Sequence, residues 1–275
     1  VKPHRVSVFQ ITILFLYLAA AVAFTMSRLP TNEQHAKVLT ITGFVAGLAA
    51  LGMHADILLV FFRPDQIGSL SLAAAISLIS LQLALIALAG AIDERLRGMS
   101  GGLLVVAAIL ALPMHTGVAT DSNPPLTWQT QTHVMVAMFS YGLLTVGAIV
   151  AVFALVQERR LKAGRLSTMN YVFAPLVTTE RLLYGITATG FVGLALAVVS
   201  GFTFVDNLFA QHLIHKTTFS IAALVVFGIL LAGRTFAGWR GQRGVYLYLG
   251  GFAFLILAYF GSRFILEEIL NRSWS

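Results

Sequence analysis

The stretch HVMVAMFSYGLLTVGAIVAVFALVQERRLK, residues 133–162, decides the fold class of this chain. Residues 133–156 contain no Lys, Arg, Asp or Glu, and as a helix they are long enough to cross the roughly 30 Å hydrocarbon core of a bilayer. The basic residues Arg159, Arg160 and Lys162 follow directly. An apolar helix that ends in a short basic loop is typical of a transmembrane span whose second end faces the cytoplasm.

The composition of the whole chain agrees with this stretch. Of its 275 residues, 58% are hydrophobic and 11% are charged, and the mean hydropathy is +0.86, which is far from the usage of a soluble domain. The net charge of +7 is distributed between apolar runs rather than gathered on one face, so it does not indicate nucleic acid. Because there is no cysteine, the sequence excludes disulfides, a thiolate nucleophile and covalent c-type haem attachment to this chain.

Eight stretches are apolar and long enough to span a bilayer. We therefore predict an all-α, polytopic membrane helix bundle of about eight transmembrane helices that forms a single transmembrane domain over residues 1–275. The only sizeable connection, residues 157–181, is polar and basic. The predicted spans are residues 7–27, 38–62, 67–92, 102–120, 133–156, 182–205, 215–233 and 245–266.

The Lys and Arg residues of the short loops predict the orientation of the spans. The loops after the fifth and seventh spans are basic and are therefore expected in the cytoplasm. Threading the other spans from there places both termini outside and puts 12 of the 18 Lys and Arg residues inside. Lys2 and Arg5 precede an apolar run that could also be a signal peptide, but the run is long for one, which favours a first span. We expect a multi-pass protein of a bacterial-type inner membrane.

The histidines gather on the predicted outer side. Of seven histidines, five fall toward that side: His54, His115, His133, His212 and His215. His54 lies on the order of 12 Å below the outer end of its span, and an ionisable residue at such depth marks a functional site by default. The alternative for any single one of them is a histidine that hydrogen-bonds between helices or anchors at the interface.

Several ligands are compatible with such a cluster, since imidazole suits zinc, copper, nickel and haem iron. Zinc or copper sites more often add close ligands in a local motif, and only His212 and His215 stand at helical spacing. Haem takes axial imidazoles from separate helices and apolar or aromatic walls, which favours haem. No span carries two histidines 13 or 14 residues apart, as an ordinary quinone-linked cytochrome b would.

Three polar segments and one arginine in a predicted span need an interpretation. Residues 119–132, ATDSNPPLTWQTQT, form an expected outer lid with Trp128 at the water boundary and a helix-capping threonine just before His133. Residues 238–244, GWRGQRG, form either a tight inside turn or a contact for lipid head groups or a partner. Glu180 and Arg181 are expected to form a charge pair on the inside surface. Arg263 can snorkel or meet a haem propionate.

Three segments in fixed order carry a family resemblance: HVMVAMFSYG, HKTTFS and GWRG. With them, the chain from about residue 38 to its end resembles the cytochrome c assembly (CcsA/HemX-like) membrane protein family, and within it a YpjD-like inner-membrane branch. The resemblance implies haem handling at the outer membrane surface for delivery to apocytochromes c. In the family a histidine ahead of a YG-like helix is a haem ligand, and His133 matches it. His54 resembles an intramembrane histidine of the branch, and His215 matches its HK motif.

The chain also departs from the family's synthases. They carry a tryptophan-rich WWD segment that is missing here, and Ala232 of LAGR stands where they have the histidine of LHTR. A later LHSY-like motif is missing too. These departures imply that the chain is not a synthase, and we expect no enzyme activity.

The sequence therefore predicts an inner-membrane haem-binding or haem-handling protein with non-covalent haem b. His54 and His133 are the first candidates for iron ligands and His115 and His215 the next, with Trp128 and Arg263 as further haem contacts. The expected partners are the lipid bilayer and another membrane protein or an apocytochrome c, but no nucleic acid. Two alternatives stay open: an accessory or regulatory membrane subunit that has lost haem, and a b-type haem redox protein.

Overall fold

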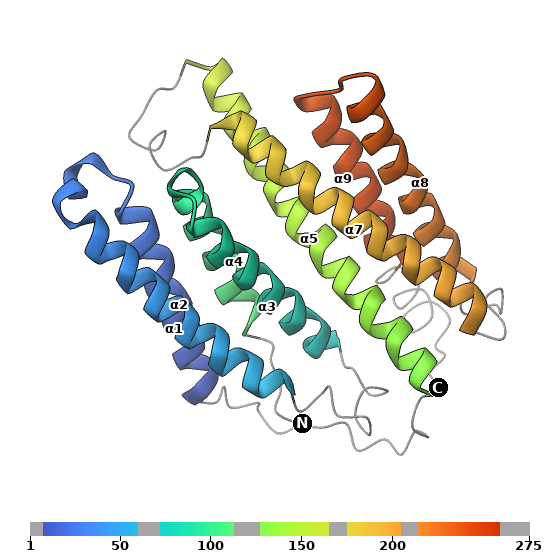
Figure 1. Cartoon of the computed structure of the whole chain (residues 1–275), viewed down its shortest axis with the longest axis horizontal. Coiled ribbons are helices and arrows are strands. Elements are labelled where there is room, and N and C mark those ends of the chain that lie inside the picture. The colour runs from blue at the N-terminus through green and yellow to red at the C-terminus, as the bar shows by residue number, and fades with distance from the viewer. Residues whose placement is uncertain (1–7, 60–71, 113–126, 165–174, 205–213, 259–275) are drawn as a thin grey trace. The chain divides into compact units, whose positions relative to one another are not determined.

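The computed structural model describes residues 8–59, 72–112, 127–164, 175–204 and 214–258 (Figure 1). These residues form helices joined by short turns, with no strand among them. The predicted all-α membrane fold is confirmed. The elements are α1 Val8–Met26, η1 Pro30–His35, α2 Ala36–Leu59, α3 Leu72–Ala91, η4 Glu94–Leu96, α4 Arg97–Leu110, α5 Trp128–Lys162, α7 Leu176–Phe204, α8 Ile214–Phe236 and α9 Gln242–Ile256.

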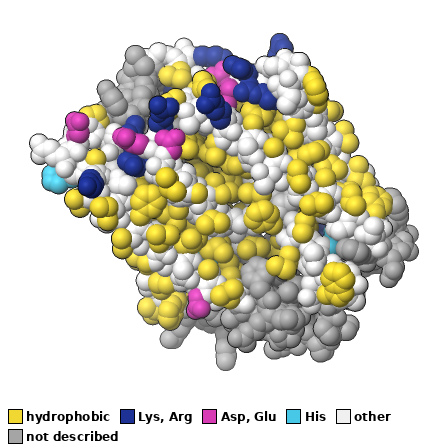
Figure 2. Space-filling view, viewed as in Figure 1, with side chains coloured by type: hydrophobic (Ala, Val, Ile, Leu, Met, Phe, Trp, Pro, Cys, Tyr) yellow, Lys and Arg dark blue, Asp and Glu magenta, His cyan; other side chains and the backbone are white. Residues whose placement is uncertain are grey.

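Five helical segments of the described chain are long and apolar enough to cross a membrane: Val8–Met26, Pro30–Leu59, Trp128–Lys162, Leu176–Thr203 and Lys216–Phe236. Large apolar side chains on these helices stay exposed, as in Phe15, Val45 and Val199. A helix of a multi-pass protein turns such side chains toward lipid. Figure 2 shows apolar side chains covering the middle of the helices, whereas Lys and Arg side chains lie mostly near helix ends.

The chain divides into two compact units. Unit 1 comprises residues 1–126 and 157–179, and unit 2 comprises residues 127–156 and 180–275. Helix α5 contributes to both units, because the division falls between Val156 and Gln157. The single transmembrane domain over residues 1–275 stays a prediction.

In unit 1, α1 packs against α2 and α4, and α3 packs against α4 and α2. The buried face of α1 includes Ile13, Tyr17, Ala20 and Phe24. The ring of Phe24 lies against α2 at Gly43, where a Cβ would be 2.8 Å from two of its ring carbons. Glycine therefore lets the two helices approach closely, which is how transmembrane helices commonly associate.

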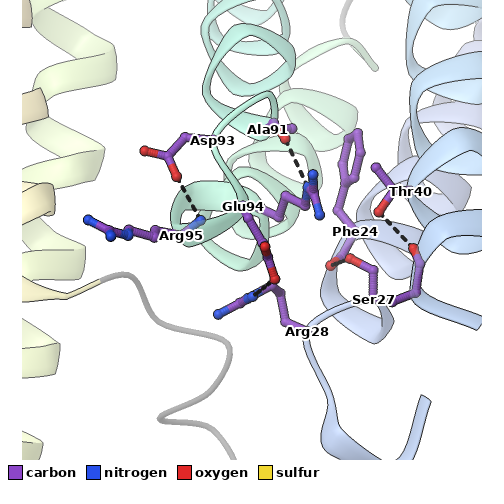
Figure 3. A network of polar contacts seen from close by, with 10 residues as sticks. Phe24, Ser27, Arg28, Thr40, Ala91, Asp93, Glu94 and Arg95 are labelled. Atoms are coloured by element: carbon purple, nitrogen blue, oxygen red, sulfur yellow. Dashed lines mark hydrogen bonds and ion pairs between the residues drawn. The ribbon is translucent and has the colours of Figure 1, made fainter. Parts of the chain in front are cut away.

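One end of unit 1 is held by polar contacts between its two hairpin connections (Figure 3). The Arg28 guanidinium, after α1, lies 2.7 Å from a carboxylate oxygen of Glu94, after α3. The Asp93 carboxylate accepts a 2.9 Å hydrogen bond from the Arg95 amide at the start of η4. The sequence places both connections on the cytoplasmic side of the membrane, and their ion pair agrees with a shared side.

In unit 2, helix α5 makes hydrogen bonds to α7 and α9 through side chains that reach a backbone carbonyl. The Ser140 hydroxyl donates to the Gly190 carbonyl at 2.7 Å, and the Tyr248 hydroxyl donates to the Leu144 carbonyl at 2.8 Å. Tyr248 also packs edge-on against Phe227 of α8, with ring centroids 5.1 Å apart. These contacts fix how α5, α7, α8 and α9 lie along one another within the unit.

Several helices begin or end outside the predicted spans. Helix α4 begins at Arg97 rather than 102, α7 begins at Leu176 rather than 182, and α5 runs from Trp128 to Lys162 rather than over 133–156. Hydropathy detects the part of a helix that lies in hydrocarbon, whereas polar residues such as Gln129 and Glu158 continue a helix into the interface. The predicted polar connection 157–181 is therefore helical at both of its ends.

Candidate functional site

His54 lies in a fully buried hydrogen-bonded triad of unit 1. Its Nδ1 atom is 3.2 Å from the Tyr17 hydroxyl of α1, and its Nε2 atom is 2.8 Å from the Ser77 hydroxyl of α3. None of the three residues is exposed. The Tyr17 and His54 rings meet edge-on, with centroids 6.0 Å apart. The imidazole thus joins three helices.

Both nitrogens of the His54 ring are used by these contacts. A neutral imidazole has one N–H donor and one acceptor nitrogen, so one of the two hydroxyls accepts from the ring and the other donates to it. A bond from Nε2 to iron would require the Ser77 hydroxyl to move away, and a bond from Nδ1 would require the same of Tyr17. In the described arrangement His54 is a bridge between helices, which is the alternative that the sequence left open.

His133 is arranged differently, in unit 2. It is half-buried in the second turn of α5, and its Nδ1 atom lies 2.9 Å from the Ser200 hydroxyl of α7. That hydroxyl donates to the Ala197 carbonyl at 3.1 Å, so it accepts from the Nδ1–H group. The lone pair of the ring is then on Nε2, and the Ala197 carbonyl is a further hydrogen-bond partner of this ring.

Metal-binding histidines also have one ring nitrogen held by an acceptor. Such residues nearly always donate their second ring N–H to a protein acceptor, which fixes the tautomer and the ring plane and raises the basicity of the ligating nitrogen. Ser200 supplies that acceptor to His133. The donor set therefore fits one axial imidazole of a haem.

Lys216 is a basic residue of unit 2 whose charge acts on this histidine. It lies in the first turn of α8, where its ammonium interacts electrostatically with the His133 ring. The register of α5 and α8 is set farther along both helices, where the hydroxyls of Tyr141 and Ser220 are 3.0 Å apart. Lys216 and His133 each precede those residues, so both lie toward the same end of the helix pair.

Trp128 is the first residue of α5, and its side chain is 70% exposed. The sequence predicted that Trp128 lies in a loop and that a threonine just before His133 caps the helix that follows. Both predictions are wrong. The capping hydroxyl belongs to Thr127, which accepts from the Thr130 amide at 3.4 Å. Thr132 lies inside the helix and donates to the Trp128 carbonyl, because the polar segment continues the helix by more than a turn.

The other candidates are described in part or not at all. His215 lies in the first turn of α8, and only its backbone is described. His115, His212 and Arg263 lie outside the described residues. Within the described ranges, no three His, Asp or Glu side chains gather as a metal site would require. His54 belongs to unit 1 and His133 to unit 2.

Four residues of these arrangements were not predicted from the sequence: Tyr17, Ser77, Ser200 and Lys216. Each stands in or at the end of an apolar helix, where a polar side chain needs a partner. A polar residue in an apolar helix can therefore be recognised in the sequence as one that needs a partner. The sequence does not show which residue that partner is.

The comparisons with known proteins agree with the resemblance that the sequence carries. The profile of the family described as "Cytochrome C assembly protein" matches residues 39–270. "Inner membrane protein YpjD" of Escherichia coli is 36% identical over 137 residues, which cover 50% of this chain and 52% of that protein. "Cytochrome c biogenesis protein CcsA" of Guillardia theta is 25% identical over 190 residues, or 62% of this chain and 63% of that protein.

The chain thus spans about half the length of the YpjD relatives that it matches. No solved structure matches it. The relatives named as inner membrane proteins, together with the apolar helices of the described chain, confirm the prediction of a multi-pass inner-membrane protein.

Proposed function

The chain belongs to the cytochrome c assembly protein family, and from that membership we propose that it binds haem b non-covalently and hands it on at the outer side of the inner membrane. The receiver we propose is an apocytochrome c or another membrane protein of the assembly process. The chain itself acts as a carrier and not as a classical enzyme. The missing tryptophan-rich segment and Ala232 in LAGR support a carrier over a synthase.

One observation carries this proposal, the His133–Ser200 pair. Nδ1 of His133 is held at 2.9 Å by a hydroxyl that is itself fixed to the Ala197 carbonyl, so Nε2 is the nitrogen we assign to iron. The bound haem would supply the iron centre and two carboxylates. Lys216 would neutralise a propionate, because its ammonium acts on the same ring. Ser200 would hold the imidazole plane.

The remaining candidates take secondary places in the proposal. His115 and His215 are proposed for the second axial position, with Trp128 and Arg263 as further contacts of the porphyrin. His54 can ligate iron only if Ser77 rotates away from Nε2, because those atoms are 2.8 Å apart. We therefore rank His133 ahead of His54.

The test is a haem titration of the detergent-purified protein, read by its Soret absorbance in the oxidised and dithionite-reduced states. Wild type should give a b-type spectrum, and His133→Ala should weaken haem binding about 100-fold or more, since a whole ligand exceeds the 10- to 100-fold effect of an outer partner. His35→Ala removes an exposed histidine of η1 and is the matched control. A wild-type protein without Soret absorbance after haem addition would refute the proposal.

A haem-free accessory subunit is the second candidate. It is favoured by His54, whose two nitrogens are both occupied by protein hydroxyls, as expected of a histidine that serves packing. This candidate predicts a protein without Soret absorbance that co-purifies with a defined membrane partner. A haem-loaded protein whose spectrum depends on His133 would exclude it.

A further inference from the structure

The turn between α8 and α9, residues 237–241, is fixed by contacts from two helices of unit 2. The Trp239 carbonyl accepts hydrogen bonds from the Tyr184 hydroxyl at 3.3 Å and from the Arg234 guanidinium at 3.1 Å. The Gly241 amide donates to the Glu180 carboxylate at 2.9 Å. The Arg234 guanidinium also stacks over the Tyr184 ring, 4.6 Å from its centroid.

The backbone of the turn requires its glycines. Gly238 and Gly241 have φ angles of +64° and +67°, which only glycine adopts readily. The Trp239 ring folds back onto Gly233 of α8, where a Cβ would overlap with ring carbons. A turn that only reverses the chain does not need this many constraints. These constraints fix the backbone from which the neighbouring side chains extend.

Glu180 contributes to this rigidity rather than to a surface charge pair. The sequence predicted an ion pair between Glu180 and Arg181, and this is wrong: Glu180 is only 9% exposed and accepts from the Gly241 amide. A buried carboxylate needs such a donor, and the glycine amide of the turn supplies it. Arg181 is exposed, and no ion pair involves it among the described residues.

The outer face of the turn is cationic and apolar. Arg240 in the turn and Arg243 at the start of α9 are exposed and, like Arg181, make no ion pair with a described carboxylate. Phe236, the last residue of α8, is 91% exposed. The corresponding end of unit 1 differs, since its Arg28 is paired with Glu94 (Figure 3). Among its described residues, this end of unit 2 therefore presents guanidiniums without an ion pair and, a few residues away in the chain, an exposed aromatic ring.

We propose that this turn binds the headgroup phosphate of an anionic phospholipid in the leaflet that the sequence predicts to be cytoplasmic. Guanidinium groups bind phosphate through paired N–H donors, and clustered basic residues beside a span recognise anionic lipids. The exposed Phe236 favours a lipid over free phosphate, because an apolar ring at the interface is buried at the boundary of headgroups and acyl chains. This inference goes beyond the proposed haem function and does not depend on it.

The first experiment is native mass spectrometry of the full chain in detergent, titrated with phosphatidylglycerol and with phosphatidylcholine. The double variant Arg240→Gln and Arg243→Gln should bind phosphatidylglycerol about tenfold more weakly than wild type. The control variant, Lys37→Gln with Arg95→Gln, removes two exposed cations from unit 1. It should change the affinity for phosphatidylglycerol by less than about twofold. Equal losses in both variants, or equal binding of the two lipids by wild type, would overturn the proposal.

A second variant separates a built site from a general attraction of charges. Glu180→Gln removes a negative charge, so a general attraction predicts tighter binding of phosphatidylglycerol. Our proposal predicts weaker binding, because the loosened turn no longer holds the arginines in place. Tyr184→Phe removes one hydrogen bond to the turn without a change of charge and should weaken binding to a smaller extent. Tighter binding by Glu180→Gln would contradict the proposal, as would displacement of the bound lipid by inorganic phosphate.

Discussion

His54 and His133 show how one residue type takes two roles within one membrane protein. The sequence assigned both to the outer half of the helices and ranked them together as iron ligands. In unit 1 both nitrogens of His54 are occupied by hydroxyls of α1 and α3. In unit 2 the side-chain hydrogen bond that the described residues give to the His133 ring is at Nδ1, with Ser200. The difference teaches that the number of ring nitrogens already used separates a packing histidine from a candidate ligand better than depth does.

The two environments also predict different consequences for stability. His54 is fully buried, and its loss would leave the Tyr17 and Ser77 hydroxyls unpaired in an apolar interior, which costs free energy. His133 is half-buried near the start of α5, where the freed Ser200 hydroxyl still donates to Ala197. We therefore expect substitution of His54 to lower mainly the stability of the fold, and substitution of His133 to lower mainly the affinity for haem.

The largest expected effect on folding comes from His54→Ala. It should lower the free energy of unfolding by about 2 to 3 kcal/mol, through a cavity and two orphaned hydroxyls. Thermal unfolding of the haem-free protein in detergent, followed by circular dichroism, measures the loss. His133→Ala should lose less than about 1 kcal/mol in the same assay. Equal losses in the two variants would remove the distinction between the two histidines.

Ser200→Ala tests the other side of the comparison. Without the hydroxyl that holds Nδ1, the His133 ring is free to rotate, and haem affinity should fall about tenfold. The matched control is Ser140→Ala, which removes a serine from the same α5–α7 contact whose hydroxyl binds the Gly190 carbonyl instead. A haem titration of both variants decides the matter. If Ser140→Ala weakens haem as strongly as Ser200→Ala, the effect belongs to helix packing and not to His133.

The fold could be predicted from the sequence because its signal is strong and local. Apolar runs such as residues 133–156 identify a membrane helix by length and composition alone. The ends of the helices were less accurate: α5 begins at Trp128 and α7 at Leu176, where polar residues extend the helix beyond the hydrocarbon. Hydropathy contains no information on that extension, so the Thr127 cap was missed.

The candidate site was predicted only as a set of histidines. Whether a ring nitrogen is occupied depends on which residue of another helix faces it, and Ser200 is 67 residues away from His133 in the chain. Tyr17 and Ser77 are likewise remote from His54. Such pairings follow from helix register and rotation, which the pattern of one helix does not specify. The predicted charge pair between Glu180 and Arg181 on the inside surface was wrong for the same reason.

Lys216→Gln should have a smaller effect on the His133 side. It removes the cation that we assign to a propionate, and haem affinity should fall about threefold, as expected of a partly solvated ion pair. Lys216→Arg keeps the charge and should restore most of the affinity. Haem titrations of both variants at low and high salt measure these affinities. The difference in haem affinity between wild type and Lys216→Gln should shrink at high salt. If Lys216→Arg lost as much haem affinity as Lys216→Gln, the length of the side chain would matter and not its charge.

The smallest expected effect belongs to the hydroxyls around His54. Tyr17→Phe keeps the ring that packs against His54 and removes one hydrogen bond, so it should cost about 0.6 kcal/mol, the average for such bonds in membrane proteins. Ser77→Ala should cost a similar amount, and neither should change haem affinity if His54 serves packing alone. Thermal unfolding and haem titration of both variants therefore test whether His54 serves packing alone. Tighter haem binding by Ser77→Ala would show that Ser77 keeps Nε2 of His54 from iron, and would place His54 beside His133 as a ligand.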